Sequence, residues 1–108
     1  MLYNRKDFYE ERGKSLMKKL YGTIMINKQI LDKQKMVQEN ISYYKLKDKK
    51  YGIEIVKENV ERENLEIANL INITDSEEAV NHILSMLVKK EIMPRDADVI
   101  DDIVKQYA

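Results

Sequence analysis

The chain has no cysteine, only three glycines and a single proline in its 108 residues. The lack of cysteine excludes disulfide bonds, thiolate metal ligands and thiol nucleophiles, and it is compatible with a reducing compartment. No apolar run approaches the roughly 18 residues of a membrane-spanning helix, and the start Met1–Asp7 lacks the apolar stretch of a signal peptide. We therefore expect a cytoplasmic protein that does not enter a membrane.

Residues suited to catalysis or metal binding are also scarce. The only histidine, His82, cannot by itself form a metal cluster or a catalytic triad. Four aspartates between residues 96 and 102 do not follow a calcium-loop pattern, because apolar residues at helical spacing run through them. The stretch Gly13–Ser15 ends like a phosphate-binding loop, but Phe8 stands where such a loop needs glycine. We expect a non-enzymatic protein with no catalytic residues, cofactor or metal.

Charge is divided between the two halves of the chain. Residues 1–50 contain 13 Lys and Arg against 6 Asp and Glu, and residues 51–108 contain 6 against 13, so +7 and −7 sum to zero. Opposite fields on one short chain can attract each other, and each can select an oppositely charged partner. This division favours a role in binding another macromolecule.

The length predicts one domain, and neither Pro nor Gly nor Ser clusters into a linker. We divide the chain into a basic N-terminal segment, residues 1–22, and a single α+β domain, residues 23–108. Asn4 can cap a helix from Arg5 to about Tyr21, although the apolar spacing is irregular and part of the segment could be disordered. Residues 27–40 could form a helix or a long loop.

The C-terminal third predicts two helices, at about residues 75–90 and 95–107. Thr74 to Glu77 has the spacing of a capping box, and Pro94 suits the first turn of the second helix. Apolar side chains recur at the i, i+3, i+4 and i+7 positions of both helices. These are Val80, Ile83, Leu84 and Leu87 in the first, and Ile100, Ile103, Val104 and Tyr107 in the second.

The middle of the chain predicts a β-hairpin, because aromatic and β-branched residues flank the polar turn Asp48–Lys50. Gly52 in its second arm marks a bulge or a close backbone approach. The expected fold is a small antiparallel meander of three or four strands, covered by the two helices. The strands are expected at about residues 23–26, 41–47, 51–57 and 64–71.

Alternation along the hairpin places large side chains from both arms in a common core with the helix stripes. The expected core residues are Tyr44, Leu46, Ile53, Ile55, Val80, Ile83, Leu84, Leu87, Ile100, Ile103, Val104 and Tyr107.

A basic surface is the candidate contact region for a partner. It consists of Arg5, Lys6, Arg12, Lys14, Lys18, Lys19, Lys45, Lys47, Lys49 and Lys50. Tyrosines among these lysines would suit base stacking and phosphate contacts, so a nucleic-acid-associated regulator is one alternative. The acidic second half argues against it, because a polyanion would be repelled. We favour a regulatory or adaptor protein that contacts another protein, including a second copy of itself.

Three features together resemble a small family of unknown function from spore-forming anaerobic Firmicutes. They are Tyr43-Tyr44-Lys45-Leu46, Tyr51-Gly52-Ile53-Glu54-Ile55, and the two terminal helices with Pro94 and Val99–Val104. The likeness covers about residues 41–108. It implies a short cytoplasmic protein with a hairpin, two helices and no assigned catalytic residue, and an influence on the decision to sporulate.

Overall fold

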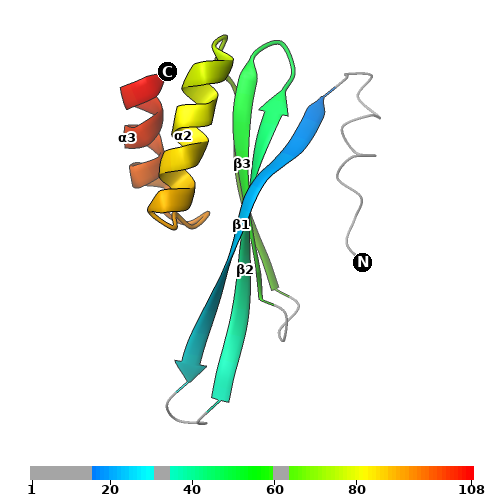
Figure 1. The fold of residues 1–108 in the computed structure, drawn as a ribbon, viewed down its shortest axis with the longest axis vertical. Coiled ribbons are helices and arrows are strands. Elements are labelled where there is room, and N and C mark those ends of the chain that lie inside the picture. The colour runs from blue at the N-terminus through cyan, green and yellow to red at the C-terminus, as the bar shows by residue number, and fades with distance from the viewer. Residues whose placement is uncertain (1–15, 31–34, 60–63) are drawn as a thin grey trace.

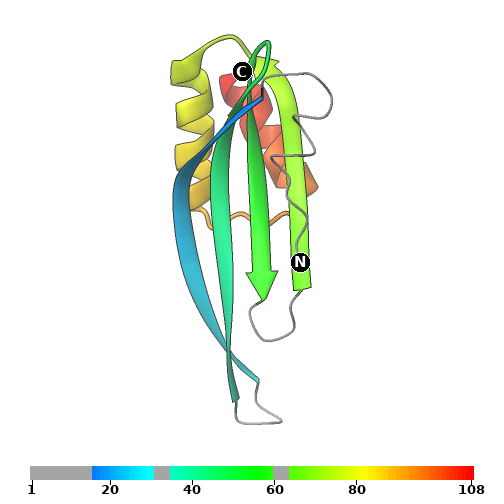
Figure 2. The same cartoon turned by 90° about the vertical axis from the view of Figure 1, so that its right-hand side faces the viewer.

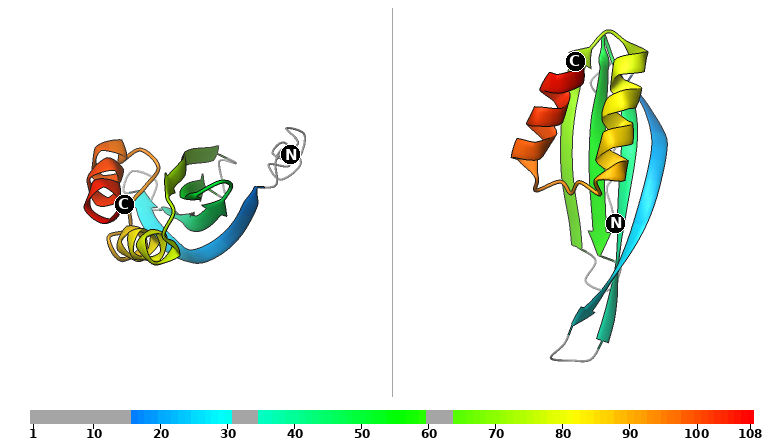
Figure 3. Two further views of the ribbon diagram at one scale, coloured as in Figure 1. Left: turned by 90° about the horizontal axis from the view of Figure 1, so that it is seen from above. Right: turned by 60° about the vertical axis from the view of Figure 1, so that its left-hand side comes forward.

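The computed structural model describes residues 16–30, 35–59 and 64–108. Within these ranges, four antiparallel strands form one sheet in the order β1-β2-β3-β4, and two helices follow (Figure 1). Their bounds are β1 Met17–Ile30, β2 Lys35–Lys47, β3 Tyr51–Asn59, β4 Asn64–Thr74, α2 Glu77–Lys89 and α3 Ala97–Tyr107. Both helices cover the same face of the twisted sheet (Figures 2 and 3). The predicted α+β fold, a meander followed by two C-terminal helices, is confirmed.

The core lies between the helices and the face of the sheet that they cover. Strand register sets Tyr43 opposite Ile55 and Ile41 opposite Lys57, so these positions point toward the helices. The helices contribute the stripe expected from their spacing, with Val80, Ile83, Leu84 and Leu87 fully buried in α2. The remaining buried members of this cluster are Ile41, Tyr43, Ile53, Ile55, Ile92, Ile100 and Ile103.

The hairpin's inward face differs from the expectation. Tyr44 lies opposite Glu54 and Leu46 lies opposite Gly52, which places both side chains on the face away from the helices. Tyr43, rather than Tyr44, therefore joins Ile55 in the core, where it is fully buried. Two adjacent tyrosines are equally suited to a strand, and only the register decides which one turns inward.

Strand β1 begins at Met17, whereas the sequence predicted a helix up to about Tyr21 and a strand only over 23–26. A bulge explains the difference, because the pairing with β2 shifts between Leu20 and Gly22 and leaves Tyr21 as an extra residue. The extra residue interrupts the alternation of apolar and polar side chains, so the pattern before Gly22 does not read as a strand. Residues 1–15, including most of the predicted N-terminal helix, lie outside the described part of the chain.

Strand β2 begins at Lys35, six residues before the predicted start at 41. Residues 35–40, expected as part of a helix or loop, pair with β1, and Glu39 and Asn40 also pair with β3. Val37, Glu39 and Ile41 alternate correctly for a strand, but the middle position is a buried carboxylate. A charged residue at an inward position hides the period of two on which the prediction depends.

Gly52 allows β4 to cross close to β3, as the sequence suggested. A Cβ atom at Gly52 would overlap the carbonyl oxygen of Leu70, and the register of β3 with β4 shifts at this point. Beyond the shift, Asn72 adopts a positive φ of 55° and accepts a hydrogen bond from the Lys50 amide at 2.9 Å. The Asn72 side chain also donates to Asp48 at 3.3 Å, so β4 is tied to the hairpin turn and extends to Thr74.

Both helices start later than predicted. The N-cap of α2 is Ser76, whose hydroxyl accepts from the Ala79 amide at 3.1 Å, while Thr74 still pairs in the sheet and accepts from the Ser76 amide. Pro94 is buried in the turn before α3 rather than in its first turn. The carboxylate of Asp96, the N-cap of α3, accepts from the Met93 amide at 2.9 Å and so closes that turn.

The connection between the helices is fixed to the centre of the sheet. Glu91 has a positive φ of 52°, and the amides of Glu91 and Ile92 donate to Val88 and Leu87, which is the Schellman arrangement at a helix C-terminus. The Tyr43 hydroxyl then donates to the Ile92 carbonyl at 2.8 Å. Burial, followed by the nearby carboxylates of Glu91 and Asp96, raises the pKa of Tyr43 well above its ordinary value.

The close approach at Gly52 predicts that Gly52→Ala lowers the free energy of unfolding by about 2–3 kcal/mol, since backbone atoms of β4 must move. Gly22→Ala is the matched control. Its Cβ would meet Val88 at an ordinary 3.7 Å, so we expect little change or a slight gain. Chemical denaturation measures both, and equal effects of the two variants would contradict this account.

The buried hydroxyl of Tyr43 predicts that Tyr43→Phe lowers the free energy of unfolding by about 1–2 kcal/mol at pH 7, because the Ile92 carbonyl loses its donor. The raised pKa means that the unfolded chain releases this proton first as the pH rises above about 10. The wild type therefore loses stability there, and its advantage over the variant should shrink. Denaturation at pH 7 to 11 tests this, and an advantage that grows would refute it.

Candidate functional site

Strand β1 forms one edge of the sheet and exposes an unusual share of the large apolar side chains. Of seven such exposed side chains in the described residues, four belong to β1: Met17, Leu20, Tyr21 and Met25, at 62%, 54%, 43% and 67% exposure. In the described part of the chain the strand pairs with β2 alone, so its outer edge carries unpaired backbone groups. Its sequence includes three lysines and no acidic residue. The strand is therefore an apolar and basic edge.

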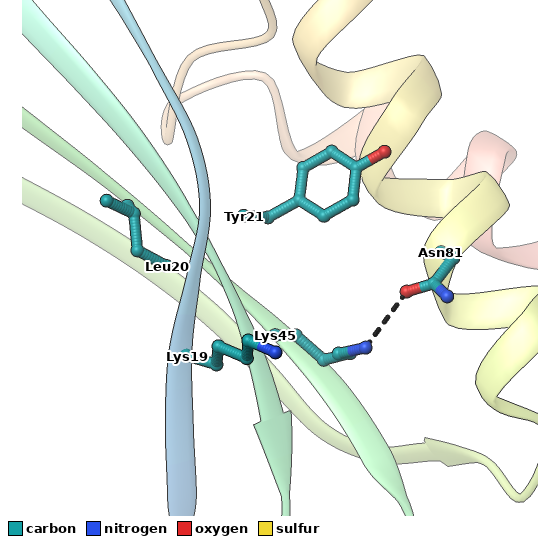
Figure 4. A pocket seen from close by; sticks show the side chains of 5 residues that line it. All are labelled: Lys19, Leu20, Tyr21, Lys45 and Asn81. Carbon is teal, nitrogen blue, oxygen red and sulfur yellow. Dashed lines mark hydrogen bonds between the residues drawn. The ribbon is translucent and has the colours of Figure 1, made fainter.

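The bulge in β1 distributes these side chains over both faces of the sheet. Leu20 and Met25 lie opposite Tyr44 and Asn40, on the face away from the helices. Tyr21 lies on the other side of the strand, between β1 and α2 (Figure 4). Apolar contact area is thus available both above and below the edge.

A cavity of about 390 Å³ lies beside this edge, between β1 and α2. It is lined by Lys19, Leu20, Tyr21, Lys45 and Asn81 (Figure 4). The Lys45 ammonium donates to Glu77 Oε2 at 2.8 Å and to Asn81 Oδ1 at 3.1 Å, so β2 and α2 are joined at the wall of the cavity. These two bonds hold the Lys45 ammonium in a fixed position.

The cavity has a positive electrostatic balance. The hydrogen bond and charge of Lys45, and then the charge of Lys19, lower the pKa of the Glu77 carboxyl, so Glu77 is ionised at neutral pH. The site therefore holds two ammonium groups and one carboxylate, which give it a net charge of +1. An anion with one negative charge would neutralise it.

The basic residues predicted as one partner surface are divided by the fold. Lys18 lies on the face away from the helices, where its ammonium is 2.9 Å from Glu54 and 4.3 Å from the centre of the Tyr44 ring. Lys19 and Lys45 line the cavity on the opposite face.

The other predicted basic residues lie apart from the cavity or outside the described ranges. Lys47 lies over the Tyr51 ring at 4.6 Å and donates to the Lys49 carbonyl in the hairpin turn. Lys49 and Lys50 are exposed in that turn. Arg5, Lys6, Arg12 and Lys14 lie outside the described residues.

The predicted core residues occupy three kinds of position. Those buried are Leu46, Ile53, Ile55, Val80, Ile83, Leu84, Leu87, Ile100 and Ile103. Val104 and Tyr107 are partly buried against the cluster, and Tyr44 is partly buried on the far face. His82 is exposed and its ring meets the Tyr107 ring edge-on at 5.7 Å, which is a packing contact rather than a catalytic arrangement.

A second group of charges extends the core on the helix-facing side. The Lys57 ammonium, almost fully buried, lies 3.5 Å from Glu39 and 3.7 Å from Glu66, and Arg95 reaches Glu66 at 3.1 Å. Lys57 and Glu66 face each other across β3 and β4, and Arg95 belongs to the turn before α3. These ion pairs tie the turn to the sheet, and their role in stabilising the fold is enough to explain them.

Other binding features are limited. A smaller cavity of about 200 Å³ between β4 and α3 is lined mainly by apolar groups, including Leu70, Pro94 and Ile100. Among the side chains that the structure describes, no three His, Cys, Asp or Glu residues are grouped so that they could hold a metal ion. Within the same residues, neither helix has the length and hydrophobicity needed to cross a membrane.

Fold and edge together define a small α+β domain with an open basic strand at one side of its sheet. The chain matches the family of unknown function DUF6514 over residues 33–106, and it belongs to that family. This confirms the predicted membership of an uncharacterised family. No curated protein and no solved structure shows a significant match to the chain. The matched range begins two residues before β2 and ends within α3, so strand β1 lies outside it.

The coupling between Lys45 and Glu77 predicts that Lys45→Gln raises the Glu77 pKa toward its ordinary value, because both the hydrogen bond and the charge are lost. An NMR titration of the side-chain carboxyl measures the shift. Lys50→Gln, an exposed lysine in the hairpin turn, is the control and should leave the pKa unchanged. An unchanged Glu77 pKa in Lys45→Gln would show that the pair does not form.

Proposed function

We propose that this protein is a non-enzymatic adaptor or regulatory protein that binds another protein through the outer edge of strand β1. The observation that carries the proposal is the concentration of exposed Met17, Leu20, Tyr21 and Met25 on a strand that has one neighbour in the described sheet. An extended segment added to such an edge gains backbone hydrogen bonds, and its alternate side chains reach both faces.

The side chains of β1 suit a partner segment that combines apolar and acidic residues. Leu20 and Met25 offer apolar contacts on one face, and Met17 and Tyr21 extend the surface around the edge. The lysines of β1 would attract carboxylates and repel other basic segments. Methionine side chains adapt their shape easily, which suits contacts with an extended chain.

A second copy of the chain is a poorer occupant of the same edge. Symmetric antiparallel pairing of two β1 strands would bring together two edges that each carry lysines and no acidic residue. Like charges directly opposite each other destabilise a strand pair. The proposal is therefore contact with a different protein, and a homodimer is an outcome that the experiment can detect.

The alternative proposal, a nucleic-acid-associated regulator, has weaker support. Lys18 and Lys45 are engaged in ion pairs on opposite faces of the sheet, which leaves no continuous basic stripe among the described residues. Binding to phosphates would weaken steeply between ~50 mM and ~200 mM salt, so fluorescence anisotropy with labelled DNA and RNA distinguishes the two proposals. Action in the cytoplasm, in the decision to sporulate, is proposed on the resemblance alone.

The experiment is quantitative capture from native lysate with the tagged full-length chain. Leu20→Ser combined with Met25→Ser should reduce recovery of the partner at least tenfold, since each lost apolar contact contributes on the order of 1 kcal/mol. Ile71→Ser is the control, because Ile71 is 51% exposed on the opposite edge strand β4. It should capture as the wild type does.

Equal recovery by the double variant and the wild type would contradict the proposal, as would recovery that depends on nucleic acid in the lysate. Light scattering of the pure wild type and double variant reports self-association. A dimer that the double variant loses would mean that a second copy occupies the edge, contrary to the proposal of a different partner.

A further inference from the structure

We propose that the cavity between β1 and α2 binds a carboxylate group, supplied by an acidic side chain of the segment that docks on β1. The source of the carboxylate rests on the proposed function, whereas the cavity itself is formed by this chain alone. Its volume of about 390 Å³ is within the range of ligand pockets and exceeds the need of one acidic side chain.

Lys45 provides a fixed donor. Its ammonium has three N–H groups, of which one is used by Glu77 and another by Asn81. A third remains for a ligand, on a side chain that is only 16% exposed and anchored at its tip. A donor held in place by other hydrogen bonds loses little conformational entropy when a ligand binds.

Lys19 provides the second positive charge. It lies beside Lys45 in the register of β1 with β2 and forms no salt bridge within residues 16–30, 35–59 and 64–108. Lys19 lines the same cavity as Lys45, and its charge lowers the pKa of Glu77. An incoming carboxylate would separate the two ammonium groups and reduce their repulsion.

Tyr21 forms the opposite wall. Because the bulge turns its ring toward α2, the ring lines the cavity and lies between β1, the edge strand, and α2 (Figure 4). A partner strand at that edge would have one row of side chains directed to this face, so an acidic side chain in that row would reach the cavity. The tyrosine ring would shield the ion pair from water and strengthen it.

The charge balance favours a carboxylate over a phosphate. Lys19 and Lys45 against Glu77 leave one positive charge, which one carboxylate neutralises. A phosphate group carries nearly two negative charges at pH 7, and the excess would face the Glu77 carboxylate.

The test is an NMR titration of the ¹⁵N-labelled full-length chain with N-acetyl-L-glutamate α-methylamide, whose only charge is its side-chain carboxylate. We expect saturable shifts of the Lys19, Tyr21, Lys45 and Asn81 amides, with a Kd on the order of millimolar for so small a probe. The neutral N-acetyl-L-glutamine α-methylamide should produce none of them, and inorganic phosphate at matched ionic strength should bind more weakly.

Lys19→Gln should weaken binding of the glutamate probe by about threefold to tenfold, because one of the two positive charges is removed. Lys50→Gln, the control in the hairpin turn, should not change it. The proposal is overturned if the wild type shows no saturable shifts at these amides, if the glutamine probe produces the same shifts, or if phosphate binds more tightly than the carboxylate.

The two proposals can fail separately, because this titration needs no partner. Absent shifts with partner capture that still depends on Leu20 and Met25 would refute the carboxylate site alone. Clear shifts with capture that does not depend on those residues would refute strand docking, and the carboxylate site would stand as a property of the chain.

Discussion

The hydrogen bond from the Tyr43 hydroxyl to the Ile92 carbonyl is the constraint on which the arrangement of the two layers depends. It joins the centre of β2 to the connection between α2 and α3, 49 residues further along the chain. Apolar packing alone would let a helix pair slide over the sheet, because the hydrophobic effect has no direction. The buried polar contact selects one position. That position places Asn81 and Glu77 of α2 opposite Lys45, and so it also builds the wall of the cavity beside β1.

The parts of the fold that the sequence could predict are those in which local pattern and burial agree. The stripes of α2 and α3 repeat at helical spacing, and the turn at Asp48–Lys50 separates two arms rich in β-branched and aromatic residues. The strands whose bounds were predicted wrongly are those in which the local pattern and the burial of the side chains disagree. Tyr21 is an extra residue in β1, and Glu39 is a carboxylate turned inward. Each interrupts the alternation of apolar and polar side chains from which the start of its strand would have been predicted.

The candidate site was predicted only in part for the same reason. Lysines were expected to share one surface, but a period of two sends Lys18 and Lys19 to opposite faces once they lie in a strand. Met17, Leu20 and Tyr21 were assigned to a helix, and Met25, although it lies in the predicted strand 23–26, was not identified as an exposed contact residue. The alternation after Gly22, with Ile24 and Ile26 inward and Met25 outward, agrees with the predicted strand over 23–26, but the bulge at Tyr21 hid the continuation of the strand back to Met17.

Strand β1 contributes to the domain through its pairing with β2 and through Ile24 and Ile26, which pack against the core, while Met17, Leu20, Tyr21 and Met25 stay largely exposed. Exchanges at such positions usually alter stability by less than about 0.5 kcal/mol. Substitution of these four exposed side chains should therefore leave the architecture unchanged, since β2, β3, β4 and both helices lie within or largely within residues 33–106, the range that matches the family. Chains related to this one could therefore differ in the side chains that this edge presents to solvent and still share one fold.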